Sequence, residues 1–450
     1  MSNAGFVDSE AVFEFLLGFV NLEKGQATEL KLDRMKSLAL ALGSPELTYP
    51  TIHVAGSKGK GSVSMMIARI LEASGRRVGL YTSPHILRWK ERISLAGEEM
   101  PEELIISAAE RVAALVEGKT PSDFEGNELP TYFELSTLLA FEAFRLAGCD
   151  IAVIETGLGG RFDSTNIVEP LVSVITPIEL EHTEWLGDTV AKIAFEKAGI
   201  IKAGKPVAIA DQVPEADQVF AGIAAERGSS LYRSGNCLRV LSVDISRSGT
   251  TACFEGSGDC FRVGNQSYTT PLIGEVQAAN MGLALLATSL ALEALGGTAL
   301  DEAAARKGLA KASLPARFEI LRDSPPLVVD GAHTPVSVAH GLAAFAKLFP
   351  GPAILLFACA KDKKHGQMAG ILAPHFGNIV ITTPGTFKQS DPAEVWRSFK
   401  DKAPGTRLVA DTSKAFAECL ALSRERKLPL FVTGSFYLAA EVIRAVSGEA

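Results

Sequence analysis

The segment TIHVAGSKGKGSVSMMIARILEASG (residues 51–75) joins an apolar run to an amphipathic one through a loop rich in glycine and lysine. The apolar run ends at Ala55, residues 56–62 hold three glycines and two lysines, and helical spacing of apolar residues begins near Ser62. Glycines allow backbone N–H groups to point toward an anion, and a helix N-terminus adds its positive dipole. The segment therefore predicts a strand, a phosphate-binding loop and a helix.

This loop departs from the strict Walker A pattern, G-x-x-x-x-G-K-[ST]. Val54 stands where the first glycine is required, and Gly61 follows Lys60 in place of serine or threonine. A flexible turn without a ligand is the alternative, but Lys58 and Lys60 would repel each other in so tight a loop unless an anion lay between them. We interpret the loop as a phosphate cradle in which Lys60 supplies a cation.

Apolar, β-prone runs alternate with helical ones through the first half of the chain. The runs are TIHVA, RVGLYT, DIAVIET, LVSVITPI and KPVAIA. This alternation predicts βαβ units, in which a mostly parallel sheet is covered by helices on both faces. We expect a P-loop-type α/β domain at the N-terminus.

The pattern changes at two later points. Residues 235–272 contain short β-prone runs between Gly, Ser and Asp turns, which predicts antiparallel hairpins appended to the sheet. Helices are predicted over residues 277–295 and 300–312, and a second series of strand and helix patterns follows, which predicts a smaller, open, Rossmann-like α/β domain. We therefore expect two domains, 1–312 and 317–450.

Composition and charge limit the class of protein. Of the 450 residues, 47% are hydrophobic and 21% charged, as in folded globular proteins, and the net charge of −8 provides no basic field for nucleic acid. No apolar run is long enough to span a membrane, and the N-terminus does not resemble a signal peptide. The six cysteines, Cys260 among them, are scattered without metal-ligand spacing. We expect a cytoplasmic protein that binds neither nucleic acid nor membrane.

Three candidate metal ligands follow predicted strands. Glu155 ends the run DIAVIE, Ser83 ends RVGLYTS, and His182 lies a few residues beyond LVSVITPI. Open α/β sheets bind ligands at the carboxyl ends of their strands, and Mg²⁺ shares oxygen ligands with nucleotide phosphates. Each residue has a structural alternative, namely a helix cap for Ser83, an ion pair with Arg161 for Glu155 and a hydrogen-bonded core position for His182.

Lys197 lies on the apolar stripe of the helix predicted within TVAKIAFEKAGII (residues 189–201). The stripe consists of positions 190, 193, 194, 198 and 201. Lys197 should therefore point inward, unlike Lys192, and burial favours the neutral amine. A lysine that extends along its stem to the surface is the alternative.

The ordered set of motifs resembles the folylpolyglutamate synthase and dihydrofolate synthase family, which is related to the Mur peptide ligases. The loop HVAGSKGKGSV resembles the family's phosphate loop, with Ser57 and Lys58 where the family usually has Thr and Asn. The resemblance covers nearly the whole chain and continues through TSPHILRWKERI, DIAVIETGLGGRFDSTN, LEHTEWLGDTVAKIAFEKAGIIK, ARFEIL, VVDGAHTP and FVTGSFYLA. Departures include Glu181, where Asp is usual, and Val276, where His is usual.

This resemblance implies a reaction and a set of site residues. The implied reaction is ATP-dependent addition of L-glutamate to the carboxylate of a folate or of dihydropteroate, through an acyl phosphate. It implies Mg²⁺ held by Ser83, Glu155 and His182, catalytic roles for Lys60, Lys197 and His182, and carbamylation of Lys197 by CO₂. The implied ATP contacts are Gly56, Ser57, Lys58, Gly59, Lys60, Gly61, Ser62, Asn280, Arg317, Asp330 and His333.

Two other classes stay open at this point. A Mur-type ligase that acts on another carboxylate shares these motifs, although the early position of the phosphate loop leaves little room for the first domain that such ligases usually carry. A P-loop ATPase without ligase activity would hydrolyse ATP with no carboxylate acceptor. We expect a monomeric ligase whose partners are ATP, L-glutamate and a folate or dihydropteroate.

Overall fold

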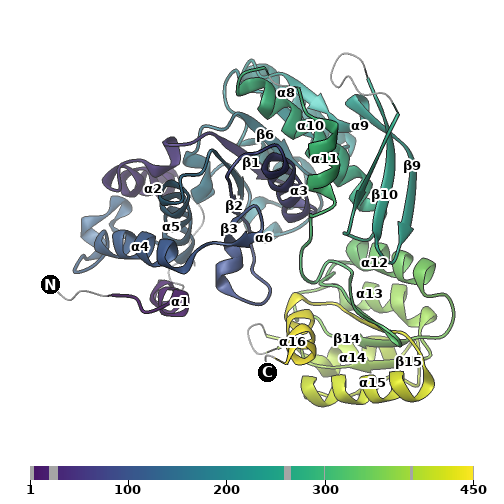
Figure 1. Cartoon of the computed structure of the whole chain (residues 1–450). Helices are drawn as coiled ribbons and strands as arrows, with labels where there is room; N and C mark the ends of the chain where they lie inside the picture. The colour runs from purple at the N-terminus through teal and green to yellow at the C-terminus, as the bar shows by residue number, and fades with distance from the viewer. Residues whose placement is uncertain (1–4, 20–28, 258–264, 298, 386–388, 449–450) are drawn as a thin grey trace. The chain divides into compact units, whose positions relative to one another are not determined.

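The computed structural model describes all of the chain except residues 1–4, 20–28, 258–264, 298, 386–388 and 449–450 (Figure 1). Cys260 lies outside the described residues. The chain forms two compact units. The first comprises Met1–Ser242, Ala252–Thr269 and Ala279–Ala312, and the second comprises Val243–Thr251, Thr270–Ala278 and Ser313–Ala450. The two short segments before residue 279 that group with the second unit lie inside the predicted first domain, 1–312.

A mostly parallel sheet of eight strands forms the centre of the first unit, in agreement with the predicted fold class. The strand order is β4-β3-β2-β5-β1-β6-β7-β8; β3 pairs antiparallel with both its neighbours, and the remaining pairs are parallel. The strands are β1 (Thr51–Ala55), β2 (Val78–Tyr81), β3 (Ile93–Leu95), β4 (Glu98–Glu99), β5 (Ile151–Glu155), β6 (Val172–Ile175), β7 (Val207–Ile209) and β8 (Leu231–Arg233). The five predicted runs correspond to β1, β2, β5, β6 and β7.

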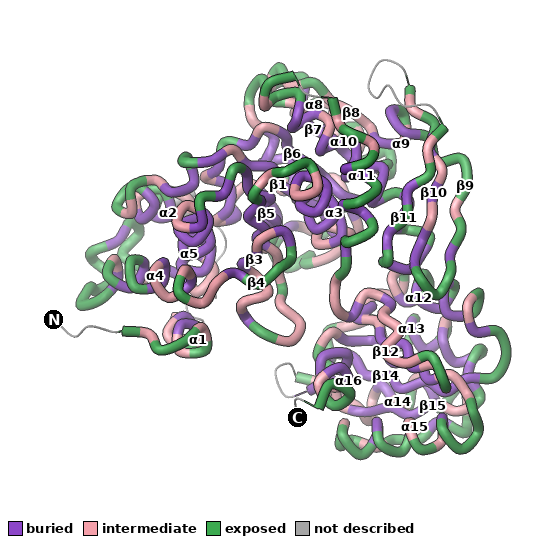
Figure 2. The backbone as a smooth tube through the Cα atoms, in the orientation of Figure 1, coloured by how far each residue is buried: buried purple, intermediate pink, exposed green. Residues whose placement is uncertain are grey.

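Helices cover both faces of this sheet. Helix α3 (Lys60–Ala73) packs over β1, β2 and β5, and α11 (Glu302–Leu309) packs against α3, as Figure 1 shows. Helix α5 (Tyr132–Leu146) lies on the other face, where its Phe144 ring leaves no room for a side chain at Gly79 of β2. The central strands are buried throughout (Figure 2). The other helices of this unit are α1 (Ser9–Leu17), α2 (Glu29–Ala41), α4 (Glu102–Ala114), α6 (Thr183–Leu186), α7 (Val190–Ala198), α8 (Pro214–Glu226) and α9 (Ser234–Cys237).

The predicted hairpin region forms a separate antiparallel sheet of three strands. These are β9 (Leu238–Ser246), β10 (Gly249–Gly256) and β11 (Gln266–Thr270). The long helix α10 (Val276–Ala294) follows, one residue offset from the prediction at each end. Within the described residues it is the one helix long and apolar enough to cross a membrane, but 78% of that apolar stretch is buried inside the protein, as in a core helix.

The second unit contains a mixed sheet of six strands in the order β12-β13-β17-β14-β15-β16. The strands are β12 (Glu319–Asp323), β13 (Pro326–Val329), β14 (Ile354–Phe357), β15 (Asn378–Ile381), β16 (Arg407–Leu408) and β17 (Leu430–Thr433). All adjacent pairs are parallel except β12 and β13. The helices are α12 (Pro335–Leu348), α13 (His365–Leu372), α14 (Pro392–Lys400), α15 (Thr412–Arg426) and α16 (Phe436–Ser447).

Candidate active site

The carboxyl ends of three neighbouring strands of the first unit meet at one edge of its sheet. Strand β1 lies between β5 and β6, with Val54 opposite Glu155 and Ala55 opposite Ile175. The loops that follow β1, β5 and β6 are therefore adjacent. Open α/β sheets bind ligands at such an edge, where the chain leaves neighbouring strands in different directions.

The loop after β1 adopts a conformation that two of its glycines make accessible. Gly56 has φ 141°, and a Cβ built on it would lie 1.9 Å from Thr176 Oγ1. Gly59 has φ 87° and precedes α3, and a Cβ there would lie 2.7 Å from Asn280 Oδ1. Both φ values lie in the region that favours glycine. The predicted loop residues and Asn280 are thus brought together, with the N-terminus of α3 directed at the same place.

Helix α3 begins at Lys60, two residues before the predicted start. Its N-terminal residues Lys60, Gly61 and Ser62 continue directly from the loop, so the first backbone N–H groups of the helix belong to the predicted cradle. Gly59 precedes the helix without a side-chain cap. These N–H groups are therefore not satisfied by a capping side chain, as an anion-binding helix start requires.

Lysine side chains gather around the loop. Lys60 Nζ donates to the carbonyl oxygen of Gly56 over 3.0 Å, and Lys197 Nζ donates to the same oxygen over 2.8 Å. Lys197 Nζ also lies 3.2 Å from Glu181 Oε1, and Lys58 Nζ lies 3.6 Å from Glu181 Oε2. Three lysines thus surround one carboxylate, which leaves the cluster with an excess of positive charge.

Lys197 is only 1% exposed, which confirms the inward orientation that the apolar stripe predicted. Burial and, to a smaller extent, the nearby charge of Lys60 together lower the pKa of its ammonium group to about 8, although Glu181 opposes the shift. Burial acts on Glu181 in the opposite sense and raises the pKa of its carboxyl group. The charges of Lys197, Lys60 and Lys58 outweigh that effect, so the pKa of Glu181 is lowered.

Two of the three predicted metal ligands are in contact. The backbone N–H of Ser83 donates to Glu155 Oε2 over 3.1 Å, and Glu155, the last residue of β5, is 2% exposed. His182 directly precedes α6, is exposed, and has φ 48°. Among the described residues no group of three His, Cys, Asp or Glu side chains could hold a metal ion. The donor set suits Mg²⁺, which combines one or two carboxylates with phosphate and water oxygens.

The second unit holds the remaining predicted ATP contacts close to one aromatic ring. The Arg317 guanidinium lies 4.5 Å from the centre of the Phe436 ring, and the His333 ring lies 5.3 Å from it. Asp330 Oδ1 accepts from the N–H of Ala332 over 2.7 Å. Burial raises the pKa of the Asp330 carboxyl group to about 6, although the Ala332 N–H and Arg317 oppose this. Arg317, Asp330 and His333 thus belong to one cluster.

The sequence did not assign a role to three residues that shape these sites. Thr176 closes the space next to Gly56, Glu181 links two lysines of the cluster, and Phe436 packs against Arg317 and His333. Glu181 and Phe436 lie inside motifs that carry the family resemblance, and that position could have indicated a role for both. Thr176 gave no signal, since its importance depends on the register between β1 and β6.

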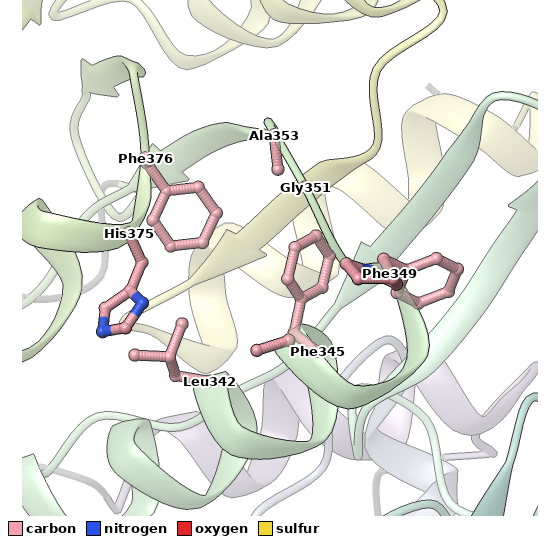
Figure 3. Close-up of a pocket in the computed structure, with 9 residues that line it drawn as sticks. Leu342, Phe345, Phe349, Gly351, Ala353, His375 and Phe376 are labelled. Carbon is pink, nitrogen blue, oxygen red and sulfur yellow. The ribbon is translucent and has the colours of Figure 1, made fainter.

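Two hollows in the surface contain none of the predicted site residues. One of about 150 Å³ lies in the second unit, where the rings of Phe345, Phe349, Phe376 and His375 surround it (Figure 3). The other, of about 460 Å³, is lined by residues of α6, α7 and α8, including the exposed Trp185. Neither therefore changes the assignment of the site to the carboxyl edge of the sheet.

Comparisons with known proteins agree with the predicted fold and family. The Mur ligase middle domain matches residues 54–288, and the Mur ligase glutamate ligase domain matches residues 316–436. The chain is 35% identical to folylpolyglutamate synthase of Lacticaseibacillus casei over 92% of this chain and 94% of that protein. It is 36% identical to dihydrofolate synthase/folylpolyglutamate synthase of Bacillus subtilis, over 91% of this chain and 94% of that protein. A solved FPGS–AMPPCP–folate complex matches with TM-score 0.81 and 32% identity, over 98% of this chain and 100% of that one.

Proposed function

Because the chain belongs to the folylpolyglutamate synthase family of the Mur ligase superfamily, we propose that it joins L-glutamate to the carboxylate of a folate in a reaction driven by ATP. One observation carries the assignment of the nucleotide site. The glycine loop, three lysines and the start of α3 converge at the carboxyl edge of β1, next to the Ser83–Glu155 contact. This arrangement suits a polyphosphate and its cation.

The reaction requires activation of a poor electrophile. A carboxylate repels nucleophiles, so its oxygen first attacks the γ-phosphorus of ATP, and ADP leaves. The glutamate amine then attacks the carbonyl carbon of the acyl phosphate, loses a proton and displaces inorganic phosphate. Two anions meet in the first step, and Lys60 is placed to neutralise the charge between them.

Mg²⁺ bound by Ser83, Glu155 and His182 would supply further charge neutralisation at the phosphates. The contact between Ser83 and Glu155 supports this donor set, because it holds the carboxylate at the strand end. Asn280 is the predicted nucleotide contact beside Gly59. The proposal also includes three ATP contacts from the second unit, namely Arg317, Asp330 and His333.

Carbamylation of Lys197 is part of the proposal. Its neutral amine would add CO₂, release a proton and become an anion. The burial of Lys197 and its lowered pKa support this, since they make the neutral amine available near neutral pH. Carbon-13 NMR of protein equilibrated with labelled bicarbonate should show one carbamate signal that Lys197→Ala abolishes and Lys192→Ala keeps. Lys192 is a matched control because it lies on the same helix and is 63% exposed.

The Lys197→Ala variant should also lose turnover. High bicarbonate should not restore the rate, whereas a short-chain carboxylate should restore part of it by replacing the carbamate. Full activity in Lys197→Ala would remove this residue from the mechanism.

ADP release tests the substrate assignment. Purified protein with Mg-ATP and L-glutamate should release ADP when tetrahydrofolate is added, and a parallel reaction with dihydropteroate tests dihydrofolate synthesis. Omission of glutamate or of the acceptor should stop sustained release. ADP release that needs neither substrate would instead support a P-loop ATPase without ligase activity.

A further inference from the structure

Lys58 and Lys197 share the carboxylate of Glu181. Lys58 Nζ lies 3.6 Å from Oε2, and Lys197 Nζ lies 3.2 Å from Oε1. The three residues come from the loop after β1, the segment after β6 and helix α7. The side chain of Lys58 is 26% exposed and that of Glu181 is 13% exposed, so their contact lies at the mouth of the cluster, whereas Lys197 is deeper at 2%.

Two backbone N–H groups of the loop are already used in hydrogen bonds within the protein and are not available to a ligand. The N–H groups of Ser57 and Lys58 both donate to the carbonyl oxygen of Pro177, over 3.0 and 3.3 Å. The Ser57 hydroxyl donates to the carbonyl oxygen of Glu179 over 3.2 Å. Because these groups bind the segment after β6, phosphate binding depends on the start of α3 and on lysine side chains more than on the middle of the loop.

Charge and exposure distinguish Lys58 from its neighbours. The cluster holds three lysines and one acid, and an ion pair that is partly exposed is weak because water screens it. The terminal phosphates of ATP carry more negative charge than one carboxylate, and they attract a flexible ammonium group more strongly. Lys58 can therefore exchange partners at little cost, whereas Lys197 is held by burial and by the Gly56 carbonyl.

We infer that Lys58 exchanges Glu181 for the terminal phosphates when ATP binds in the loop. Glu181 thus competes with ATP for Lys58. This inference rests on the proposed nucleotide site at the loop. It makes Lys58, in the position where the family usually has Asn, a determinant of triphosphate affinity.

A double-mutant cycle tests whether Lys58 binds the phosphates itself, as the exchange requires, or acts only by holding Glu181 in place, which we call tethering. Dissociation constants for AMPPCP and AMP are measured for the wild type, Lys58→Gln, Glu181→Gln and the double variant. Lys58→Gln should weaken AMPPCP binding by about ten-fold, in line with the loss of one charge-assisted contact. It should leave AMP, which lacks the terminal phosphates, unchanged. Glu181→Gln should leave AMPPCP binding equal or tighter, and Lys58→Gln should still weaken it in that background.

Tethering predicts the opposite pattern. If Lys58 acted only by holding Glu181, Lys58→Gln would have no further effect once Glu181 was Gln, and that result would overturn the exchange. Lys58→Arg keeps the charge and should retain affinity, whereas Lys205→Gln alters an exposed lysine outside the cluster and should change nothing. If Lys58→Gln does not fold, the same cycle is measured with Lys58→Met, and its outcome decides between exchange and tethering. Thermal unfolding shows whether each variant is folded.

A Lys60→Ala variant separates failure of this inference from failure of the proposed site. If Lys60→Ala weakens AMPPCP binding while Lys58→Gln leaves it unchanged, only the exchange is wrong. If neither variant alters AMPPCP binding, the nucleotide does not bind in the loop, and both proposals fail. The wild type should also lose affinity more steeply with added salt than Lys58→Gln does.

Discussion

Lys60 and Lys197 donate hydrogen bonds to one oxygen atom, the carbonyl of Gly56, from Nζ atoms 3.0 and 2.8 Å away. Two ammonium groups on one acceptor repel each other, which is part of the reason that the pKa of Lys197 is lowered, after the larger effect of burial. The conformation of Gly56 therefore sets the position of two predicted catalytic side chains at once. An anion between them would remove the repulsion.

Substitution of Gly56 should therefore disrupt nucleotide binding. Gly56→Ala would place a Cβ 1.9 Å from Thr176 Oγ1 at φ 141°, a contact that only a shift of the loop can relieve. We expect at least a ten-fold loss of AMPPCP affinity, measured by calorimetry. Gly222→Ala is the control, because Gly222 lies in α8 with nothing within 4 Å of the added Cβ. It should keep the affinity and stabilise the protein by about 0.5–1 kcal/mol. Unchanged affinity in Gly56→Ala would contradict the assigned loop geometry.

Removal of the Lys60 charge should slow the reaction more than it weakens folate binding. We expect Lys60→Met to lower kcat by roughly 10²–10³-fold, the usual effect of losing a group that stabilises transition-state charge. Steady-state ADP release with tetrahydrofolate and glutamate measures this, and KM for the folate should stay within about two-fold. The control is Lys311→Met, an exposed lysine of the first unit. A kcat near the wild-type value would exclude Lys60 from the phosphoryl transfer.

The buried pair of Arg34 and Glu134 should matter for stability alone. Arg34 Nε and Nη2 donate to the two carboxylate oxygens of Glu134 over 3.0 and 2.9 Å, and the side chains are 1% and 2% exposed. Glu134→Gln removes the buried counter-charge of Arg34 and leaves only the Glu128 carboxylate, which lies 3.7 Å away and is 63% exposed. Unfolding in urea should therefore require about 3–5 kcal/mol less free energy.

The exposed pair of Lys36 and Asp33 is the matched control, because it involves the same helix α2 and side chains that are 59% and 57% exposed. Lys36→Gln should change stability by at most about 0.5 kcal/mol. Equal effects of the two substitutions would show that burial does not govern these pairs.

Local patterns predicted much of this fold because β1, β2 and β5 to β7 are short, apolar and separated by helices. They did not predict β12, whose residues Glu319–Asp323 follow a proline and are only half-buried, with no apolar alternation. Its strand conformation depends on antiparallel pairing with β13, which no local pattern specifies. Strands β3 and β4 at one end of the first sheet and the edge strand β8 at the other were also missed, and each has at most three residues.

In the site, as in the fold, features within one segment were predicted and contacts between distant segments were not. The inward direction of Lys197 followed from helical spacing within one segment, and the structure buries it. No local pattern pairs Glu181 with Lys58, because that contact joins residues more than a hundred positions apart and depends on β1 and β6 being neighbours. Ser83 and Glu155 were predicted as ligands on one edge, and the contact between them depends on the parallel register of β2 and β5.

His53 should make the protein sensitive to acid. It lies fully buried in β1, where burial, with a smaller effect of Lys202, lowers the pKa of its ring from 6.5 to about 3. Its Nε2 contacts Thr165 Oγ1 over 2.8 Å, and Thr165 donates to Asp163, so Nε2 carries the proton. Nδ1 has no hydrogen-bond partner among the described residues.

The sign of the effect follows from proton uptake. Between pH 6.5 and pH 3 the unfolded chain binds a proton at His53 and the folded protein does not, so stability falls as the pH falls through this window. From pH 7.5 to pH 5 the loss due to His53 should be about 2 kcal/mol. Urea unfolding at the two pH values should show a loss that is about 2 kcal/mol larger in the wild type than in His53→Gln, because the contributions of other titrating groups, such as Asp330, are common to both proteins. The comparison within each variant cancels the cost of the substitution itself.

His340→Gln, at an exposed position of α12, should keep the full wild-type pH dependence. If His53→Gln does not fold, NMR of the wild-type ring should show a neutral imidazole down to pH 5. A ring that titrates near 6.5, or a His53→Gln variant with the wild-type acid sensitivity, would mean that solvent reaches β1 at the start of the phosphate loop. The phosphate loop would then not be supported by a rigid strand from which water is excluded, and its lysines require such a strand to hold their positions.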